Sequence, residues 1–199
     1  MIDKLKLLHR EEINFFKHFQ YLRLEMILEI KTIINSFWFL LPAAFANMAP
    51  EIFKWFPLLE SPLSVRLFGS NKTWRGVIFG ILMAIIITLI QQAIYLKFPQ
   101  LYIIDYSKLN GFLLGFLFGF GAVGGDLIKS FIKRRIGIAP GEPWLIADQV
   151  NWSIGALIAV SFYIFPGFEL AITTIILFFF LHILINHLAY WLGIRATRW

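Results

Sequence analysis

VIFGILMAIIITLIQQAIYL, residues 77–96, decides the fold class of this chain, because the run is long, strongly apolar and free of charge. A helix needs about 20 mainly apolar residues to cross the hydrocarbon core of a bilayer, and this run supplies them. Its apolar residues do not alternate with polar ones, as they would in the strands of a membrane barrel. The segment therefore predicts a transmembrane helix.

Four further segments have a similar character. Residues 32–50 and 149–168 are uncharged, and residues 170–194 are uncharged apart from two histidines. Residues 110–125 form a shorter run that leads directly into Asp126. We therefore predict an all-α integral membrane protein with five transmembrane helices.

Composition agrees with this fold class and limits the chemical classes of partner to be expected. The 199 residues are 59% hydrophobic and only 15% charged, whereas a soluble domain is about a quarter charged. The absence of cysteine excludes disulfides and thiolate metal sites. A net charge of +6 favours anionic partners such as lipid headgroups, phosphates or nucleotides. Nucleic acid is not expected, because the basic residues lie beside apolar spans rather than along a soluble face.

The distribution of lysine and arginine predicts the orientation. Cytoplasmic loops of membrane proteins are enriched in these residues. Beyond residue 31 they concentrate in residues 53–75, after the third span, and at the C-terminus. We therefore expect two cytoplasmic basic loops, a cytoplasmic C-terminus and an outside N-terminus in a multi-pass protein of the cell membrane. The six lysines and arginines of residues 1–31 would by themselves favour a cytoplasmic N-terminus. Residues 1–31 mix charges with apolar residues at helical spacing, which predicts an amphipathic helix at the interface, separate from a transmembrane domain of residues 32–199.

Glycines recur every fourth residue at Gly111, Gly115 and Gly119. This spacing is typical of helices that pack closely through small residues. It is also compatible with a face that leaves room for a lipid tail or a water-filled cleft.

The first candidate site is Gly-Ser-Asn-Lys-Thr-Trp-Arg-Gly, residues 69–76, directly before the second span. Small and amide residues let backbone N–H groups turn toward an anion, and a helix N-terminus attracts phosphate. Lys72 and Arg75 would add positive charge, and the Thr73 hydroxyl could donate. The leading spacing of a P-loop is missing. A topological anchor with a helix cap explains the segment equally well.

The second candidate site follows the third span. On a helix, Asp126, Lys129 and Lys133 share one face, and a carboxylate at the end of a basic ridge suits a metal–phosphate site. The alternative is a cytoplasmic anchor in which Asp126 pairs with Lys129. Arg134 and Arg135 extend the basic run and by themselves indicate no more than an anchor.

The third candidate site opens the fourth span, where Asp148 and Asn151 lie one helical turn apart. Both can offer oxygen ligands to one ion, and Mg²⁺ commonly takes one or two carboxylates plus substrate phosphates. Asp126 and Asp148 are both expected at cytoplasmic helix ends, so they could converge. Ionisable groups at such depth are costly and usually functional.

Together these segments resemble the archaeal CDP-archaeol synthases and, more distantly, the CDP-diacylglycerol synthases. The resemblance rests on an ordered series of pieces: Leu41-Pro42, Ala46-Asn47-Met48-Ala49-Pro50, Asn71-Lys72-Thr73-Trp74-Arg75-Gly76, Gly125-Asp126, Lys129-Ser130, Lys133-Arg134-Arg135, Asp148-Gln149 and His182 with Asn186. It covers about residues 38 to 199. One departure stands out, since the family usually has a second aspartate where this chain has Asn151.

The resemblance implies a Mg²⁺-dependent cytidylyltransferase that moves CMP from CTP to an isoprenoid ether lipid phosphate, 2,3-di-O-geranylgeranylglycerol 1-phosphate. It implies catalytic roles for Asp126, Lys129, Lys133 and Asp148, with Asp126, Asp148 and Asn151 as metal ligands. The residues expected to contact the nucleotide are Asn71, Lys72, Thr73, Arg75, Arg134, Arg135 and Gln149.

Other functions fit the sequence less well. A lipid transporter or scramblase would be expected to show inverted repeats and broken helices at the bilayer midplane, and neither is evident. CDP-alcohol phosphotransferases carry an aspartate-rich motif that this chain lacks. A non-enzymatic scaffold would not need two aspartates at basic helix ends. The sequence leaves the oligomeric state open.

Overall fold

The structure is a computed structural model that describes the backbone of residues 2–193 and the side chains of residues 17–100 and 102–193. Within this part of the chain every long element is a helix. The elements are α1 (Ile2–Ile52), α2 (Val65–Phe68), α3 (Trp74–Tyr95), η1 (Pro99–Leu101), η2 (Tyr106–Lys108), α4 (Gly111–Arg135), α5 (Leu145–Ser161) and α6 (Phe168–Trp191).

The described helices have the lengths and composition of membrane spans. Three of them, α3, α4 and α6, are long and apolar enough to cross a bilayer, and α5 is a shorter apolar helix. The all-helical, membrane-spanning fold is therefore confirmed. That α1 and α5 also span, giving five, stays a prediction.

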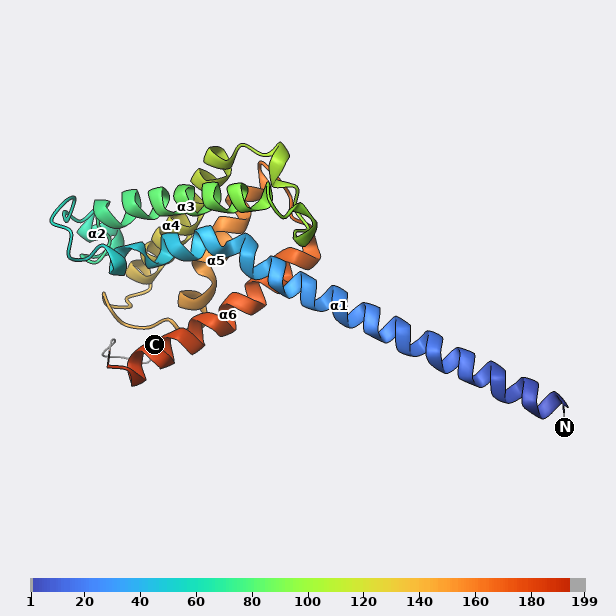
Figure 1. The fold of residues 1–199 in the computed structure, drawn as a ribbon. Coiled ribbons are helices and arrows are strands. Elements are labelled where there is room, and N and C mark those ends of the chain that lie inside the picture. Colours follow the sequence, from blue (N-terminus) through green and yellow to red (C-terminus); the bar gives the residue numbers. More distant parts are fainter. Residues whose placement is uncertain (1, 194–199) are drawn as a thin grey trace.

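α1 is longer than the sequence suggested. It is a single helix through residue 52, and its N-terminal half projects from the bundle as a free rod (Figure 1). The backbone has no break at residue 31, where we placed a domain boundary, and that boundary stays a prediction. The bundle begins where the Thr32 hydroxyl donates to Glu169 (3.2 Å) and the Asn35 side-chain oxygen accepts from the Ile103 amide (2.8 Å). The C-terminal tail lies outside the described residues.

Two helix boundaries also differ from the sequence expectation. α4 does not end at Gly125 but continues to Arg135, so the second basic segment is the last turns of a helix rather than a loop. α5 begins at Leu145 and ends at Ser161, several residues before the predicted bounds at each end. Both shifts place charged side chains on rigid helix ends.

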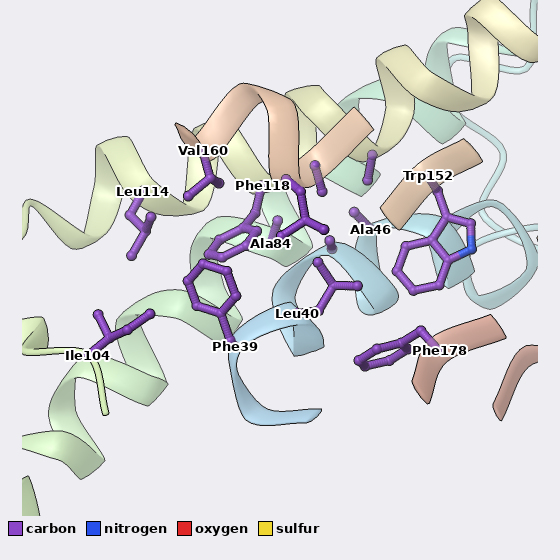
Figure 2. Packing of buried hydrophobic residues seen from close by; sticks show 14 of the residues in the cluster. Phe39, Leu40, Ala46, Ala84, Ile104, Leu114, Phe118, Trp152, Val160 and Phe178 are labelled. Atoms are coloured by element: carbon purple, nitrogen blue, oxygen red, sulfur yellow. The ribbon is translucent and has the colours of Figure 1, made fainter. Parts of the chain in front are cut away.

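The core lies where α1, α3, α4 and α5 meet (Figure 2). Phe39 of α1 packs edge-to-face on Phe118 of α4, with ring centroids 5.1 Å apart. Trp152 of α5 packs in the same way on Phe178 of α6, at 5.4 Å. The first contact joins α1 to α4 and the second joins α5 to α6. α3 packs against α1 and α4 through small residues.

Proline in α1 creates a polar link to α3. Pro42 has no N–H, so it cannot donate to the carbonyl of Trp38, four residues earlier. The side-chain amide of Gln91, which is buried in α3, donates to that carbonyl instead at 2.6 Å. A buried polar side chain on an otherwise apolar span therefore compensates for a missing helical hydrogen bond.

The glycines of α4 bring backbones into close contact. A Cβ on Gly119 would lie 2.7 Å from the Ile81 Cα in α3, so close packing is the reading that the structure supports. On the other side, Gly121 and Gly125 of α4 meet Gly155 of α5, and a Cβ on Gly155 would lie 2.9 Å from the Gly125 Cα. We call Gly121, Gly125 and Gly155 the α4–α5 glycine seam. It holds Asp126 beside the start of α5.

Candidate active site

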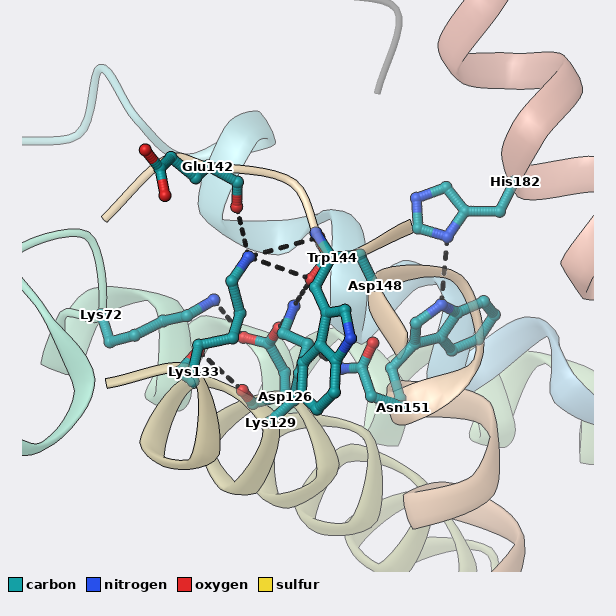
Figure 3. A network of polar contacts seen from close by, with 11 residues as sticks. Lys72, Asp126, Lys129, Lys133, Glu142, Trp144, Asp148, Asn151 and His182 are labelled. Atoms are coloured by element: carbon teal, nitrogen blue, oxygen red, sulfur yellow. Dashed lines mark hydrogen bonds and ion pairs between the residues drawn. The ribbon is translucent and has the colours of Figure 1, made fainter. Parts of the chain in front are cut away.

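One end of the bundle gathers five charged side chains, which we call the Lys–Asp cluster: Lys72, Asp126, Lys129, Lys133 and Asp148 (Figure 3). Lys72 comes from the loop before α3, the next three residues from the last turns of α4, and Asp148 from the first turn of α5. Segments far apart in the sequence therefore converge, as predicted for the two aspartates.

Lys129 bridges the two aspartates. Its Nζ lies 3.0 Å from Asp126 Oδ1 and 2.9 Å from Asp148 Oδ1. Lys72 forms an ion pair with the other oxygen of Asp126, and Lys133 lies 3.3 Å from Asp148 Oδ2. The pairing of Asp126 with Lys129 considered above does exist, but it is one link in a network that joins two helices. Three ammonium groups face two carboxylates, so this part of the site carries a positive charge.

The loop of residues 136–144 closes over this network. Lys133, which is buried, donates to the backbone carbonyl of Glu142. The Trp144 amide donates to Asp148 Oδ2 at 2.6 Å, so this carboxylate caps the start of its own helix. Asp148 is held by fixed donors on both sides, which defines where its oxygens lie.

Asn151 lies beside Asp126 rather than Asp148. Its amide is best satisfied with the nitrogen donating to the carbonyls of Ala147 (2.8 Å) and Asp148 (3.1 Å). As drawn in Figure 3, the amide nitrogen donates to Asp126 Oδ1 at 3.4 Å. In the exchanged orientation the amide oxygen takes that position beside Asp126 and accepts from the Trp152 amide (3.1 Å). This arrangement offers one carboxylate and one amide oxygen side by side.

A small cavity of about 60 Å³ adjoins the Lys–Asp cluster on the side of α1 and α3. Its polar lining includes Asn47, Asn71, Lys72 and Asp126. Thr73, also in the lining, has its hydroxyl engaged, since it accepts from the Gly76 amide at 3.3 Å and caps α3. The segment before α3 is thus both a helix cap and one wall of the site.

Six residues predicted to contact the nucleotide lie outside the Lys–Asp cluster. Asn71 and Thr73 line the adjoining cavity, and the other four do not. Arg75 donates to the Phe56 carbonyl (2.7 Å) and pairs with Glu60 (3.0 Å), which fixes the preceding loop. The Arg135 guanidinium lies over the Phe131 ring, 4.9 Å from its centroid.

Arg134 and Gln149, the other two, also make no ion pair with the described side chains of the cluster. The Arg134 guanidinium lies next to Gly69, so it links the two basic segments. Gln149 is buried, and its side-chain oxygen has no hydrogen-bond partner among the described residues.

Sequence reasoning missed two contributors to the site, Glu142 and Trp144. Glu142 acts through its backbone carbonyl, which no side-chain pattern can indicate. Trp144 lies in a loop before an apolar run, where tryptophan is common as an interface residue. Its position directly before Asp148-Gln149 was the available signal.

The comparisons with known proteins agree on one family. The family model described as "CarS-like: CDP-archaeol synthase" matches residues 28–199. A CDP-archaeol synthase of Methanocaldococcus jannaschii is 35% identical over 176 residues, covering 85% of this chain and 98% of the relative. The Pyrococcus furiosus CDP-archaeol synthase is 40% identical over 129 residues, covering 63% of this chain and 73% of the relative.

A solved structure has the same fold. It is described as "Structural insight into an intramembrane enzyme for archaeal membrane lipids biosynthesis", and it matches with a TM-score of 0.62 at 23% identity, covering 77% of this chain and 94% of that chain. With the family model spanning every residue of the Lys–Asp cluster, these findings place the protein: it is a member of the CDP-archaeol synthase family.

Proposed function

We propose that this protein transfers CMP from CTP to 2,3-di-O-geranylgeranylglycerol 1-phosphate, an unsaturated archaetidic acid, giving CDP-archaeol and pyrophosphate. The observation that carries the proposal is the bridging of Asp126 and Asp148 by Lys129, flanked by two more lysines, at one end of a membrane bundle. Relatives named CDP-archaeol synthase align along 85% of the chain. A lipid transporter or scramblase has no support from these relatives.

The reaction joins two anions. A phosphate oxygen of the lipid attacks the α-phosphorus of CTP, a new P–O bond forms, and the bond from the α-phosphorus to the bridging oxygen breaks. Pyrophosphate leaves with that oxygen and its electron pair. Because a phosphate monoester is largely ionised near neutral pH, the attack needs no obligatory general base. The barrier is mainly charge repulsion and charge development, which fixed cations lower.

The positions of the cluster's lysines support this chemistry. Lys129 and Lys133 project from a rigid helix, and Lys72 faces them from the loop before α3. We assign Lys72 and Lys133 to the phosphates of the two substrates and Lys129 to the reacting phosphoryl group between them. The present partners of these lysines are carboxylates, so substrate phosphates would replace carboxylate oxygens with phosphate oxygens. The fixed helix ends would orient the bound phosphates.

The donor set fits Mg²⁺. Asp126, Asp148 and the amide oxygen of Asn151 are hard oxygen ligands, the type that Mg²⁺ prefers. Within the described residues no group of three or more His, Cys, Asp or Glu side chains is placed to hold a metal. Triphosphate oxygens would therefore have to complete the coordination, as is common for this ion. Bound there, Mg²⁺ would neutralise triphosphate charge.

The proposed placement in the membrane puts the Lys–Asp cluster on the cytoplasmic face, where CTP is found, with five spans and the N-terminus outside. It is supported by the excess of lysine and arginine at that end of the bundle. It is also supported by α1, which leaves the bundle at the opposite end (Figure 1).

The test is a CMP-transfer assay with the purified full chain in detergent. CTP labelled at the α-phosphate should transfer its label to the lipid phosphate and release pyrophosphate, and omission of either the lipid or Mg²⁺ should abolish transfer. A transporter or scramblase would instead move lipid across a vesicle bilayer without consuming CTP. Absence of label transfer in a folded, Mg²⁺-supplied preparation would refute the proposal.

A further inference from the structure

The Trp144 indole lacks the aromatic contacts that hold Trp152 and Trp38 in the bundle. Trp152 packs on Phe178 and donates its ring N–H to His182 Nδ1 at 3.3 Å. Trp38 packs on Tyr102 at 5.4 Å. Among the described side chains, no aromatic ring stacks on Trp144 and no cation lies over it. Its ring is half-buried, and none of the described aromatic or cationic side chains covers its face.

The backbone of Trp144 fixes this residue at the site. Because the Trp144 amide donates to Asp148 Oδ2 at 2.6 Å, the side chain must start beside the Lys–Asp cluster. Figure 3 draws Trp144 among the side chains of this cluster, with its backbone amide bonded to Asp148. A flat apolar surface therefore borders a group of ammonium ions.

Local helix chemistry does not explain a tryptophan here. Trp144 is the N-cap of α5, and its side chain makes no capping hydrogen bond. Serine, threonine, aspartate and asparagine are the residues that stabilise this position. A residue that breaks a local preference at a charged site usually has a role in that site.

We infer that Trp144 is the platform on which the cytosine ring of CTP stacks, while the lysines take the phosphates. This inference rests on the proposed function and names the residue that would position the base. Stacking of a base on an aromatic ring tolerates any base, because each has a π-face. Trp144 therefore contributes affinity for the nucleoside, and selection of cytosine over uracil must come from polar groups elsewhere. As a positioning residue it would set where the α-phosphorus lies relative to Lys129.

The experiment compares Trp144→Ala and Trp144→Phe with the unaltered chain in detergent. Loss of a stacking surface should raise the KM for CTP by about 5- to 150-fold in Trp144→Ala, while Trp144→Phe keeps most of the affinity. The KM for the lipid phosphate and inhibition by pyrophosphate, which has no base, should change little. Trp55→Ala is the control, since Trp55 is 85% exposed in a different loop, and it should behave as the unaltered chain.

Two results would overturn the inference. One is an unchanged CTP KM in a folded Trp144→Ala variant. The other is an equal loss of affinity for CTP and pyrophosphate, which would mean that Trp144 only supports the loop or anchors it at the interface. Equilibrium binding of CTP, measured without turnover, separates this failure from failure of the proposed function. If the unaltered chain binds CTP more tightly than Trp144→Ala but transfers no CMP, the proposed function is refuted and the stacking inference stands.

Discussion

Gly155→Ala should separate α4 from α5 and damage the site from a distance. A Cβ at position 155 would lie 2.9 Å from the Gly125 Cα and would overlap the Gly121 carbonyl oxygen more closely still. Ordinary contact begins near 3.4 Å, so the backbones must move apart by about 0.5 Å at Gly125 and by about 1.1 Å at the Gly121 carbonyl, where the distance would be 2.3 Å. Both contacts are with backbone atoms rather than a flexible side chain, so the helices themselves must shift.

The size of the effect follows from this displacement. Overpacking of a close contact costs about 1–3 kcal/mol, which corresponds to roughly 2–12 °C in Tm for a chain of this size. Lys129 spans the same two helices, with Asp126 on one side and Asp148 on the other at 3.0 and 2.9 Å. Since a misplacement of about 1 Å can cost roughly 100-fold in rate, we expect kcat to fall about 10- to 100-fold.

The assay is CMP transfer alongside a thermal unfolding curve in the same detergent. Gly124→Ala is the matched control, because it is the neighbouring glycine and a Cβ there would have nothing within 4 Å. That variant should keep its turnover and gain up to about 1 kcal/mol from helix propensity. If Gly155→Ala matches Gly124→Ala in both Tm and turnover, the glycine seam does not set the geometry of the site.

Three further substitutions address the Lys–Asp cluster directly. Asp148→Asn should lower kcat by at least about 100-fold, the scale of losing a key electrostatic group; near-normal turnover in saturating Mg²⁺ would refute its assignment. Lys72→Ala should raise the KM for CTP about 10- to 100-fold, as expected for a lost charge-assisted bond, and unchanged kinetics would leave Lys72 as an anchor only. Asn151→Asp should lower the Mg²⁺ concentration needed for half-maximal transfer, because it adds a charged oxygen beside Asp126; an unchanged requirement in a folded variant would exclude position 151 as a ligand.

Sequence patterns predicted the parts of this molecule that depend on local chemistry. Uncharged runs predicted the helices, since only a helix or a closed barrel satisfies the backbone in lipid. The spacing of Asp126, Lys129 and Lys133 predicted a shared face, and the ion pairs confirm that they converge with Asp148.

The remaining features depend on contacts between distant segments. Arg75 has the residue type and spacing of an anion ligand, yet Glu60 and the Phe56 carbonyl take its donors. The continuity of α1 through residue 31 was missed because its charges favoured an interfacial helix. Trp144 was missed because a lone aromatic residue in a loop gives no pattern until its neighbours in space are known.

Because α1 is uninterrupted, its projecting part is rigidly connected to the part inside the bundle. At 1.5 Å per residue, its 51 residues extend about 77 Å, more than twice the roughly 30 Å of a hydrocarbon core. The same rod that projects beyond the bundle ends with Asn47 and Pro50 in the wall of the cavity beside Asp126. A sideways force on the projecting part of α1 would therefore rotate the helix about its packed segment near Phe39 and Leu40. Pro42, where one helical hydrogen bond is missing, lies between that segment and the cavity wall, and the Gln91 side chain supplies the bond that replaces it.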